Sequence, residues 1–272
     1  MLRKIKDKYT KEEIFAQLEA LGAPRDSVVL AHTSLRAIGA VEGGAEALLD
    51  VMIEYFTAEG GLFCVPTHTW HKLGEEIVLD MSSADNCLGA FSTVALLDKR
   101  GVRSENPTHS MVVFGDRARA EGFIVDDAFV KTPTAPESAY GKICDEGGYI
   151  LLLGVSQTKN TYLHAVAEML DIPNRMEKEY GKVKLRRENG EIAEREFKLF
   201  FADFSEDVSH RFEKYDVAFR YHGCIADGFV GNAPTQLCDA RGMKDTVELI
   251  FKNSGGEDPL ATEEPIPPKW YC

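Results

Sequence analysis

Several features that mark particular classes of protein are missing from this 272-residue chain. No apolar run approaches the ~20 residues of a membrane-spanning helix, so the sequence does not predict a membrane protein. The start, MLRKIKDKYTKEEIF, is basic but has no apolar segment, so we expect no secretory signal. The six cysteines are scattered without a CxxC pair. That spacing favours reduced thiols in a cytosolic protein over a disulfide framework or a zinc site.

Positive charge is also scarce. The chain has 31 Lys and Arg against 44 Asp and Glu, a formal net charge of −13. Binding to nucleic acid needs a basic surface, so this balance argues against a nucleic-acid partner. An acidic cleft would instead attract a polycationic ligand, although an acidic surface also serves solubility alone.

Three common active-site motifs are absent as well. The sequence contains no GxxxxGK[ST] phosphate loop, no GxGxxG dinucleotide fingerprint and no GxSxG nucleophile elbow. It therefore gives no support to a P-loop enzyme, a Rossmann dehydrogenase or a serine hydrolase.

What is present is an alternation of strand-like and helix-like segments. Apolar runs predict strands at 27–32, 60–66, 110–115 and 149–155. Helical spacing predicts helices at 10–22, 45–56, 90–101, 161–171 and 244–253. A strand, a helix and a strand at this spacing form a βαβ unit with a parallel pair.

The pattern changes after about Asn174. Residues 182–197 alternate around Asn189-Gly190, which predicts a β-hairpin, and residues 203–219 are charged and helix-like. Residues 222–243 return to a strand-like pattern, and the Pro-rich tail is expected to be extended. Without a linker long enough to divide the chain, we expect one α/β domain over 1–272 with a later antiparallel excursion.

Histidines follow three of the predicted strands, in AHTS (31–34), PTHTW (66–70) and NTYLH (160–164). Ligands of doubly wound sheets bind outside the carboxyl ends of the strands, so parallel strands would bring these segments together. His164 is the leading catalytic candidate. Glu168 lies four residues later on the same helical face, either as its orienting carboxylate or as half of an ordinary surface pair.

Two further readings remain open at this point. His32, His68 and His71 permit a metal site, and a metal-dependent hydrolase would use them. The loop with Gly39, Gly43 and Gly44 precedes a helix whose N-terminus is a natural anion site, but a glycine-rich turn without a ligand explains the same residues.

The order and spacing of five segments add a resemblance. They are VVLAHTSLRAIGAVEGGAEALLD, GGLFCVPTHTW, NPTHSMVVFG, YILLLGVSQTKNTYLHAVAE and GNAPTQLCDARGM. Together they resemble the antibiotic N-acetyltransferase family, whose best-known members are aminoglycoside 3-N-acetyltransferases. This family differs from the GNAT acetyltransferases, whose R/Q-x-x-G-x-G/A signature fails here at Val41.

The resemblance implies a three-layer α/β/α sandwich around a mixed, largely parallel sheet, with residues 174–225 as a substrate-side insertion. It implies direct acetyl transfer from acetyl-CoA to an aminoglycoside, at the 3-amino position, without a metal. His164 would be the general base, Glu168 would hold its tautomer, and His32 would position a reactant. Two positions depart from the family pattern, because Ala167 and Asn106 stand where many members have Glu and His.

The remaining expected roles fall into two sets. The cofactor is expected to contact Thr33, Ser34, Leu35, Arg36, Gly39, Val41, Gly43, Gly44, Thr67 and Ser110. The acceptor is expected to contact His68, Trp70, His109, Asp203 and Glu206. Backbone N–H groups of residues 33–35 are expected to stabilise the developing oxyanion. We expect a cytoplasmic monomer or homodimer. The alternatives are a transferase for another amine, the metal-dependent hydrolase, and a CoA-binding protein without turnover.

Overall fold

Seven strands form the main sheet of the computed structural model, which describes residues 6–205 and 207–272. Their order is β11 (Ile225–Val230), β12 (Ala233–Asp239), β8 (Tyr149–Leu153), β2 (Val28–Thr33), β4 (Leu62–Pro66), β7 (Met111–Phe114) and β6 (Val102–Arg103). The strand β2 pairs in parallel with both β4 and β8, which confirms the predicted βαβ unit.

The sheet is mixed, as expected, but its parallel part is limited to the three central strands. The outer pairs β12–β8, β11–β12, β4–β7 and β6–β7 are all antiparallel. A short turn joins β6 to β7, and so short a connection permits only an antiparallel pair. The strand predicted at 110–115 is confirmed as β7, and it pairs with β4 in the antiparallel direction.

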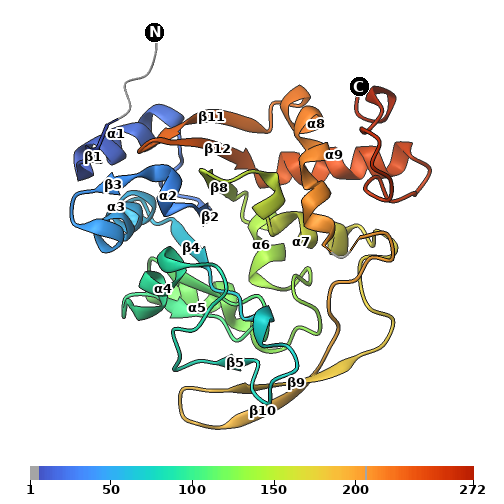
Figure 1. Cartoon of the computed structure of the whole chain (residues 1–272), viewed down its shortest axis with the longest axis horizontal. Coiled ribbons are helices and arrows are strands. Elements are labelled where there is room, and N and C mark those ends of the chain that lie inside the picture. The colour runs from blue at the N-terminus through green and yellow to red at the C-terminus, as the bar shows by residue number, and fades with distance from the viewer. Residues whose placement is uncertain (1–5, 206) are drawn as a thin grey trace.

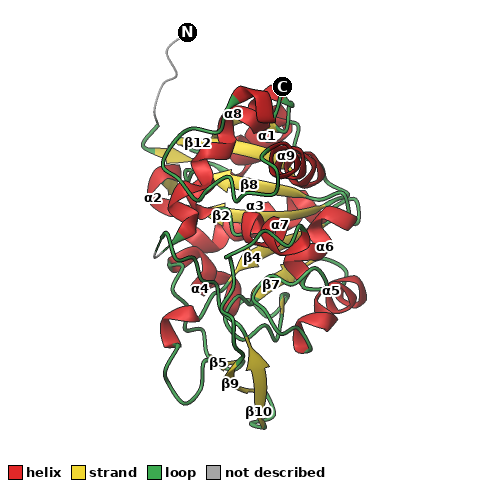
Figure 2. Cartoon of the chain, turned by 90° about the vertical axis from the view of Figure 1, so that its right-hand side faces the viewer, coloured by secondary structure: helices red, strands yellow, loops and turns green. Residues whose placement is uncertain are grey.

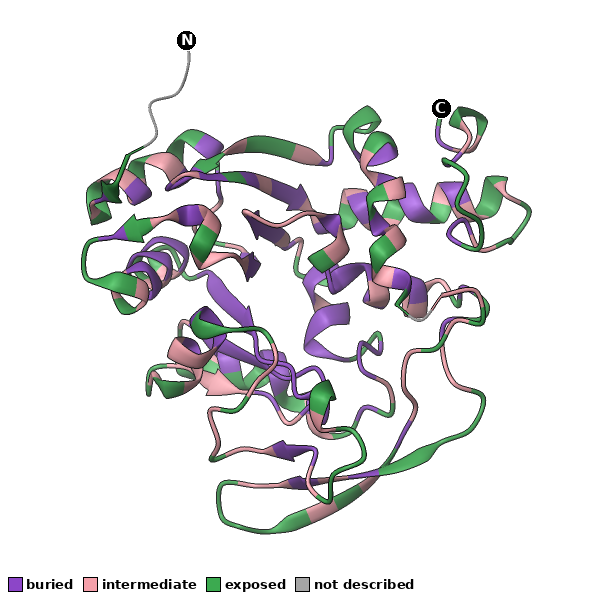
Figure 3. Cartoon of the chain, in the orientation of Figure 1, coloured by how far each residue is buried: buried purple, intermediate pink, exposed green. Residues whose placement is uncertain are grey.

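Helices cover both faces of this sheet, which confirms the three-layer arrangement (Figure 2). One face packs against α1 (Lys11–Leu21), α2 (Leu35–Ile38), α3 (Gly44–Thr57) and α4 (Ala90–Leu97). The other packs against α5 (Arg117–Ile124), α6 (Ala139–Asp145), α7 (Tyr162–Met169), α8 (Asp216–Tyr221) and α9 (Ala240–Asn253). Successive residues of β2 alternate between these two cores, because strand side chains point to opposite faces. The central strands are accordingly largely buried (Figure 3).

The predicted hairpin is confirmed as β9 (Gly181–Arg186) and β10 (Ile192–Phe197). Gly190 adopts a left-handed φ of 83° in the connecting turn, a conformation that glycine tolerates well. Together with β5 (Leu79–Asp80) the hairpin forms a separate three-stranded sheet, which lies apart from the main sheet (Figure 1). The charged segment that follows forms the 3₁₀ helix η4 (Val208–Tyr215) and α8, and both pack on the main core.

Smaller elements complete the chain. The segment 33–44, expected to be a loop, contains α2 and the strand β3 (Ala40–Val41), which pairs with β1 (Lys8–Tyr9). Further 3₁₀ turns are η1 (Trp70–Lys72), η2 (Val125–Ala128), η3 (Gln157–Lys159) and η5 (Pro268–Trp270). In the tail, Ile266 and Tyr271 are buried against the main core. Across residues 6–205 and 207–272, no helix is both long and apolar enough to span a bilayer.

A buried ion pair ties the start of the insertion to the segment before this tail. The Arg175 side chain donates from Nε and Nη2 to the two carboxylate oxygens of Asp258, both at 2.6 Å. Both side chains are almost completely buried. A fork of this kind is geometrically demanding, so it fixes the path of the chain near residue 175.

We predict that Asp258→Ala lowers the free energy of unfolding by roughly 3–5 kcal/mol, because it leaves the Arg175 charge buried without a partner. Urea denaturation monitored by circular dichroism measures this loss. Glu194→Ala is the matched control, since it breaks an exposed pair with Lys182 and should cost less than about 1 kcal/mol. Equal losses in the two variants would contradict the anchoring role of the buried pair.

Candidate active site

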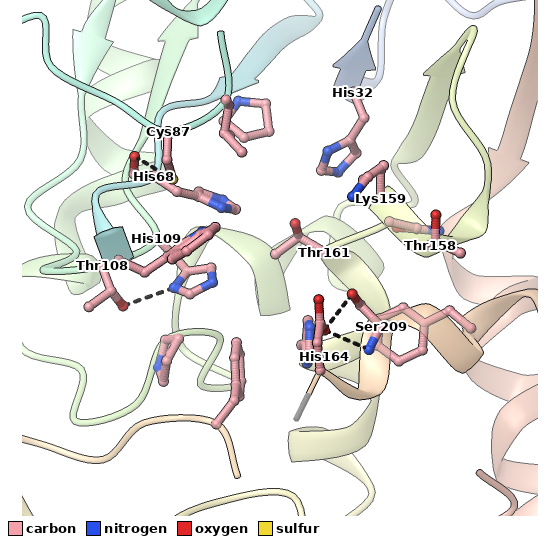
Figure 4. A pocket seen from close by; sticks show the side chains of 18 of the residues that line it. His32, His68, Cys87, Thr108, His109, Thr158, Lys159, Thr161, His164 and Ser209 are labelled. Atoms are coloured by element: carbon pink, nitrogen blue, oxygen red, sulfur yellow. Dashed lines mark hydrogen bonds between the residues drawn. The ribbon is translucent and has the colours of Figure 1, made fainter. Parts of the chain in front are cut away.

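The carboxyl ends of the three parallel strands open on one cavity of about 670 Å³. His32 and Thr33 end β2, His68 follows β4, and the segment after β8 carries His164. His109 joins them because β7 is antiparallel to β4, so the amino end of β7 lies at the same edge. Four histidines from four segments therefore line a single cavity (Figure 4), which is of ordinary size for a ligand site.

His164 is held by a well-ordered turn between β8 and α7. The buried Asn160 side chain accepts a hydrogen bond from the backbone N–H of Tyr162 at 3.2 Å and donates one to Gln157 at 2.8 Å. The Tyr162 hydroxyl donates to the Ala240 carbonyl at 2.9 Å, which fastens α7 to α9. The first turn of α7, and with it His164, is thereby fixed relative to the sheet.

The His164 imidazole lies between two aromatic rings. It stacks on Phe200 with centroids 4.0 Å apart and planes 12° apart, and it meets the Phe212 ring edge-on at 4.9 Å. Burial is the main cause that holds the pKa of His164 well below its usual value, followed by electrostatic repulsion between a protonated His164 and the neighbouring His109 and Arg175. The ring is therefore neutral at physiological pH and able to accept a proton.

Glu168 does not contact His164 through a hydrogen bond in the described part of the chain. Its carboxylate accepts hydrogen bonds from the hydroxyl of Thr132 and from both the N–H (2.9 Å) and the hydroxyl (2.6 Å) of Thr134. The expected pairing of Glu168 with His164 is thus not formed in this structure, although the two residues share a helix. Glu168 instead fastens the loop at 132–134 to α7.

His68 and His109 form a second, tightly packed pair. Their ring centroids are 4.3 Å apart. His68 Nε2 is 2.7 Å from the Tyr140 hydroxyl, and His109 Nδ1 is 2.8 Å from the Thr108 hydroxyl. Burial lowers the pKa of His109 to about 3, and burial together with the neighbouring histidines holds the pKa of His68 well below its usual value. Both rings are therefore neutral and serve as hydrogen-bonding groups in the cavity wall.

Asn106, one of the two departures from the family pattern, has a clear structural task. Its side-chain oxygen accepts the N–H of His109 at 3.0 Å, and its amide nitrogen donates to the Pro133 carbonyl at 2.8 Å. It thus shapes the turn that presents His109 and links this turn to the 132–134 loop.

His32 and Thr33 leave buried polar atoms unsatisfied at the cavity. Neither Nε2 of His32 nor the hydroxyl oxygen of Thr33 has a hydrogen-bond partner within the described residues. Burial lowers the pKa of His32 to about 3, so its ring is neutral. Buried polar groups are normally paired, and two unpaired ones that face a cavity indicate where a ligand supplies the partner.

The other residues of the expected cofactor loop, Ser34 to Gly44, do not line the cavity. The N–H of Ser34 donates to the Leu153 carbonyl at 2.8 Å and so is not available as the expected oxyanion donor. Gly39 adopts a left-handed φ of 82°, which favours glycine, and a Cβ there would lie 2.9 Å from the Asn232 side chain. Gly43 and Gly44 are exposed and left-handed at the start of α3, with φ of 81° and 77°.

Thr67 and Ser110 were also expected at the cofactor, and the structure places them elsewhere. Both are completely buried, neither lines the cavity, and their hydroxyl oxygens are 2.9 Å apart. Ser110 also donates to the Thr67 carbonyl at 2.8 Å. Their hydrogen bonds join the end of β4 to the start of β7, which makes them part of the framework.

Of the residues expected to contact the acceptor, some line the cavity and one does not. His68, His109 and Trp70 line the cavity, and Trp70 is 48% exposed at its rim. Asp203 does not line it and accepts a hydrogen bond from Asn174. Glu206 lies outside the described residues.

The histidines considered for a metal do not converge. His71 does not line the cavity, and its Nε2 lies 3.4 Å from Asp85, away from His32 and His68. In the described ranges, no group of three or more His, Cys, Asp or Glu side chains is arranged to hold a metal ion.

Several residues of the site escaped the sequence analysis. Lys159, Glu177, Phe200 and Phe212 line the cavity, and Tyr140 lies behind its wall as the partner of His68. The sequence signal for Lys159 is its position, because it is a cation five residues before the candidate base His164. The aromatic residues gave no signal, since an aromatic residue in a strand-like or helix-like run is normally a core residue.

Comparison with known proteins supports a single family. Residues 30–252 match the model of the family described as aminoglycoside 3-N-acetyltransferase. The chain is 26% identical to an aminoglycoside N(3')-acetyltransferase-like protein of Bacillus subtilis, covering 92% of this chain and 94% of that protein. It is 28% identical to aminoglycoside N(3)-acetyltransferase VIII of Streptomyces fradiae, covering 61% of this chain and 63% of that one.

Solved structures share the fold. A histidine-to-alanine variant of aminoglycoside acetyltransferase AAC(3)-IVa, in complex with a gentamicin, superposes with a TM-score of 0.78 at 22% identity, covering 93% of this chain and 92% of that one. The binary complex of AAC-IIIb with CoASH also has a TM-score of 0.78, at 19% identity, covering 93% and 99%.

We predict that Glu168→Gln destabilises the protein by about 1–3 kcal/mol at acid pH, because the amide nitrogen cannot accept a hydrogen bond from Thr132 or Thr134 as a carboxyl oxygen does. Burial raises the pKa of Glu168. The wild-type side chain therefore stabilises most at acid pH and less as pH rises through that raised value. The stability gap between wild type and variant should narrow from acid to neutral pH in urea titrations. A gap that widens instead would contradict this account.

Proposed function

This chain belongs to the aminoglycoside 3-N-acetyltransferase family and is an acyltransferase, and on that premise we propose that it transfers the acetyl group of acetyl-CoA to an amino group of an aminoglycoside, at the 3-N position, with His164 as general base. The observation that carries the base assignment is a neutral histidine ring, fixed at the start of α7, that lines the cavity at the carboxyl ends of the parallel strands.

The donor side of the cavity is proposed to lie at the end of β2. CoA is an anionic molecule, and Lys159 is the one Lys or Arg among the described cavity-lining residues. Lys159 directly precedes the buried Asn160 of the His164 turn, and Figure 4 shows it next to His32. The unpaired polar atoms of His32 and Thr33 lie at the same strand end and fit a ligand with carbonyl and amide groups. The exposed N-terminus of α3 offers a further anion site outside the cavity.

The chemistry asks two things of the protein. The thioester supplies an activated acetyl group, and the acceptor must present an uncharged amine. His164 takes the proton that leaves the nitrogen as the new C–N bond forms, and it returns this proton to the departing thiolate as the C–S bond breaks. Because the ring is neutral at rest, it becomes charged only while it carries this proton. No covalent enzyme intermediate is needed.

The acceptor side is proposed to include Glu177 and Asp207, the acidic residues among the described cavity lining. Opposite charge would draw a polycationic acceptor toward them, and this attraction should weaken with salt. A transferase for another amine and a CoA-binding protein without turnover remain the alternatives. Release of free thiol from acetyl-CoA, assayed across a panel of aminoglycosides and simpler amines, distinguishes all three. The metal-dependent hydrolase would need His32, His68 and His71 as ligands. Because His71 does not line the cavity, the proposed set lacks its third ligand.

A cytoplasmic location belongs to the same proposal. All six cysteines are free thiols, as expected in a reducing compartment.

We predict that His164→Ala keeps the fold and lowers turnover by roughly 100- to 10,000-fold, the usual contribution of a general base. A base acts only when unprotonated, so wild-type turnover should fall at acid pH with an apparent pKa below the ordinary histidine value of about 6.5. This acid limb should be absent from the variant. Thiol-release rates from pH 5 to pH 9, beside melting temperatures, test both statements. A folded variant with near-normal turnover would refute the base assignment.

We predict that Lys159→Ala raises the KM for acetyl-CoA by roughly 2- to 5-fold, the range of an exposed ion pair. The KM of the acceptor should stay nearly constant, because a cation does not assist a cationic ligand. Lys142→Ala is a matched control, since Lys142 pairs with Asp126 and does not line the cavity. An unchanged donor KM in Lys159→Ala would place the donor elsewhere.

A further inference from the structure

We propose that Phe200, supplied by the substrate-side insertion, is the positioning residue of His164 in place of a carboxylate. This inference rests on the proposed role of His164 as general base. A catalytic histidine is normally oriented by a hydrogen bond to a third group, and this bond is missing for His164, because no side chain in the described part of the chain forms it.

The nearby polar groups are committed to other partners. Glu168 binds Thr132 and Thr134. One carboxylate oxygen of Asp207 accepts from the N–H and the hydroxyl of Ser209, at 2.9 and 2.6 Å. His109 Nδ1 is engaged with the Thr108 hydroxyl. The ring contacts of His164 are with two aromatic side chains, Phe200 and Phe212.

Phe200 lies nearly parallel to that ring, with planes 12° apart and centroids 4.0 Å apart. The Phe212 ring contacts a second side of the imidazole in an edge-on geometry, with centroids 4.9 Å apart. A stack on one face and an edge contact on another leave the imidazole little freedom to tilt or rotate. Phe200 also meets His109 edge-on at 5.1 Å, so one side chain contacts two of the four cavity histidines.

The backbone that carries Phe200 is fixed independently of His164. Residues 175–177 pair with residues 199–201: the N–H of Phe201 donates to the Arg175 carbonyl at 3.0 Å, and the N–H of Glu177 donates to the Leu199 carbonyl at 3.0 Å. Arg175 is held in turn by its buried pair with Asp258. Phe200 is therefore presented by a braced segment, as a positioning role requires.

The stack has an electrostatic consequence as well. An apolar ring over the imidazole excludes water, which disfavours the charged form of His164. The charged or titratable groups near this ring are His109 and Arg175. The same cavity lining also contains His32, His68, Cys87, Lys159, Glu177 and Asp207. Removal of Phe200 admits water to the imidazole face and shifts the acid limb of the rate profile to higher pH, toward the ordinary histidine range.

Three substitutions separate positioning from bulk packing. Phe200→Ala should lower kcat by roughly 10- to 100-fold, the scale expected for a misplaced catalytic group, with the KM for acetyl-CoA within about twofold of wild type. Phe200→Leu should show most of this loss, because it fills space without a planar face. Phe200→Tyr should keep kcat close to the wild-type value, because tyrosine retains the planar ring that stacks on His164. Phe129→Ala is the matched control, since Phe129 is an exposed phenylalanine that does not line the cavity.

A double-mutant cycle decides whether Phe200 acts through the histidine. If it does, Phe200→Ala in a His164→Ala background should cause almost no further loss of thiol-release rate. A full additional loss in that background, or wild-type kcat in a folded Phe200→Leu variant, would overturn the inference. Failure of the proposed function looks different: no wild-type thiol release with any amine, or normal turnover of His164→Ala alone.

Discussion

The parallel pairing of β8, β2 and β4 is the constraint on which the candidate site depends. Parallel strands end at the same edge of a sheet, so the segments after them converge without any attraction between them. Apart from the polar end of β2, these strands contribute apolar side chains to both cores, and two helical layers cover them. A break in this pairing would separate His32, His68 and His164 whatever their own contacts.

Burial then decides the chemistry of the converging side chains. Each of the four cavity histidines has its pKa lowered, with burial as the first cause. They are neutral for the same reason, but their surroundings differ. His68 and His109 have hydroxyl partners, His32 has an unsatisfied nitrogen, and His164 is enclosed by aromatic rings. The one enclosed by rings is the one whose proton transfer our proposal requires.

The insertion links this site to distant parts of the chain. Its hairpin extends into a separate small sheet, yet the segment after the hairpin returns and places Phe200 on His164. The return path is held by pairing with residues 175–177 and, through Arg175, by Asp258 near the tail. Under our proposals, acceptor recognition through Glu177 and Asp207 and the orientation of the base through Phe200 both fall to this one segment.

The sequence by itself determined the strands β2, β4, β7 and β8, most of the helices, the β2–α3–β4 unit and the hairpin at Asn189-Gly190, because periodicity and turn chemistry are local. It also determined the histidines that lie at the strand ends. Only the tertiary structure decided their partners. Glu168 turns to the 132–134 loop, Thr67 and Ser110 bind each other in the framework, and His71 turns to Asp85. Phe200 and Tyr140 reach the site from segments without any local signal. Spacing along a chain specifies which face of an element a residue occupies, whereas a hydrogen-bond partner depends on which loop packs against that face.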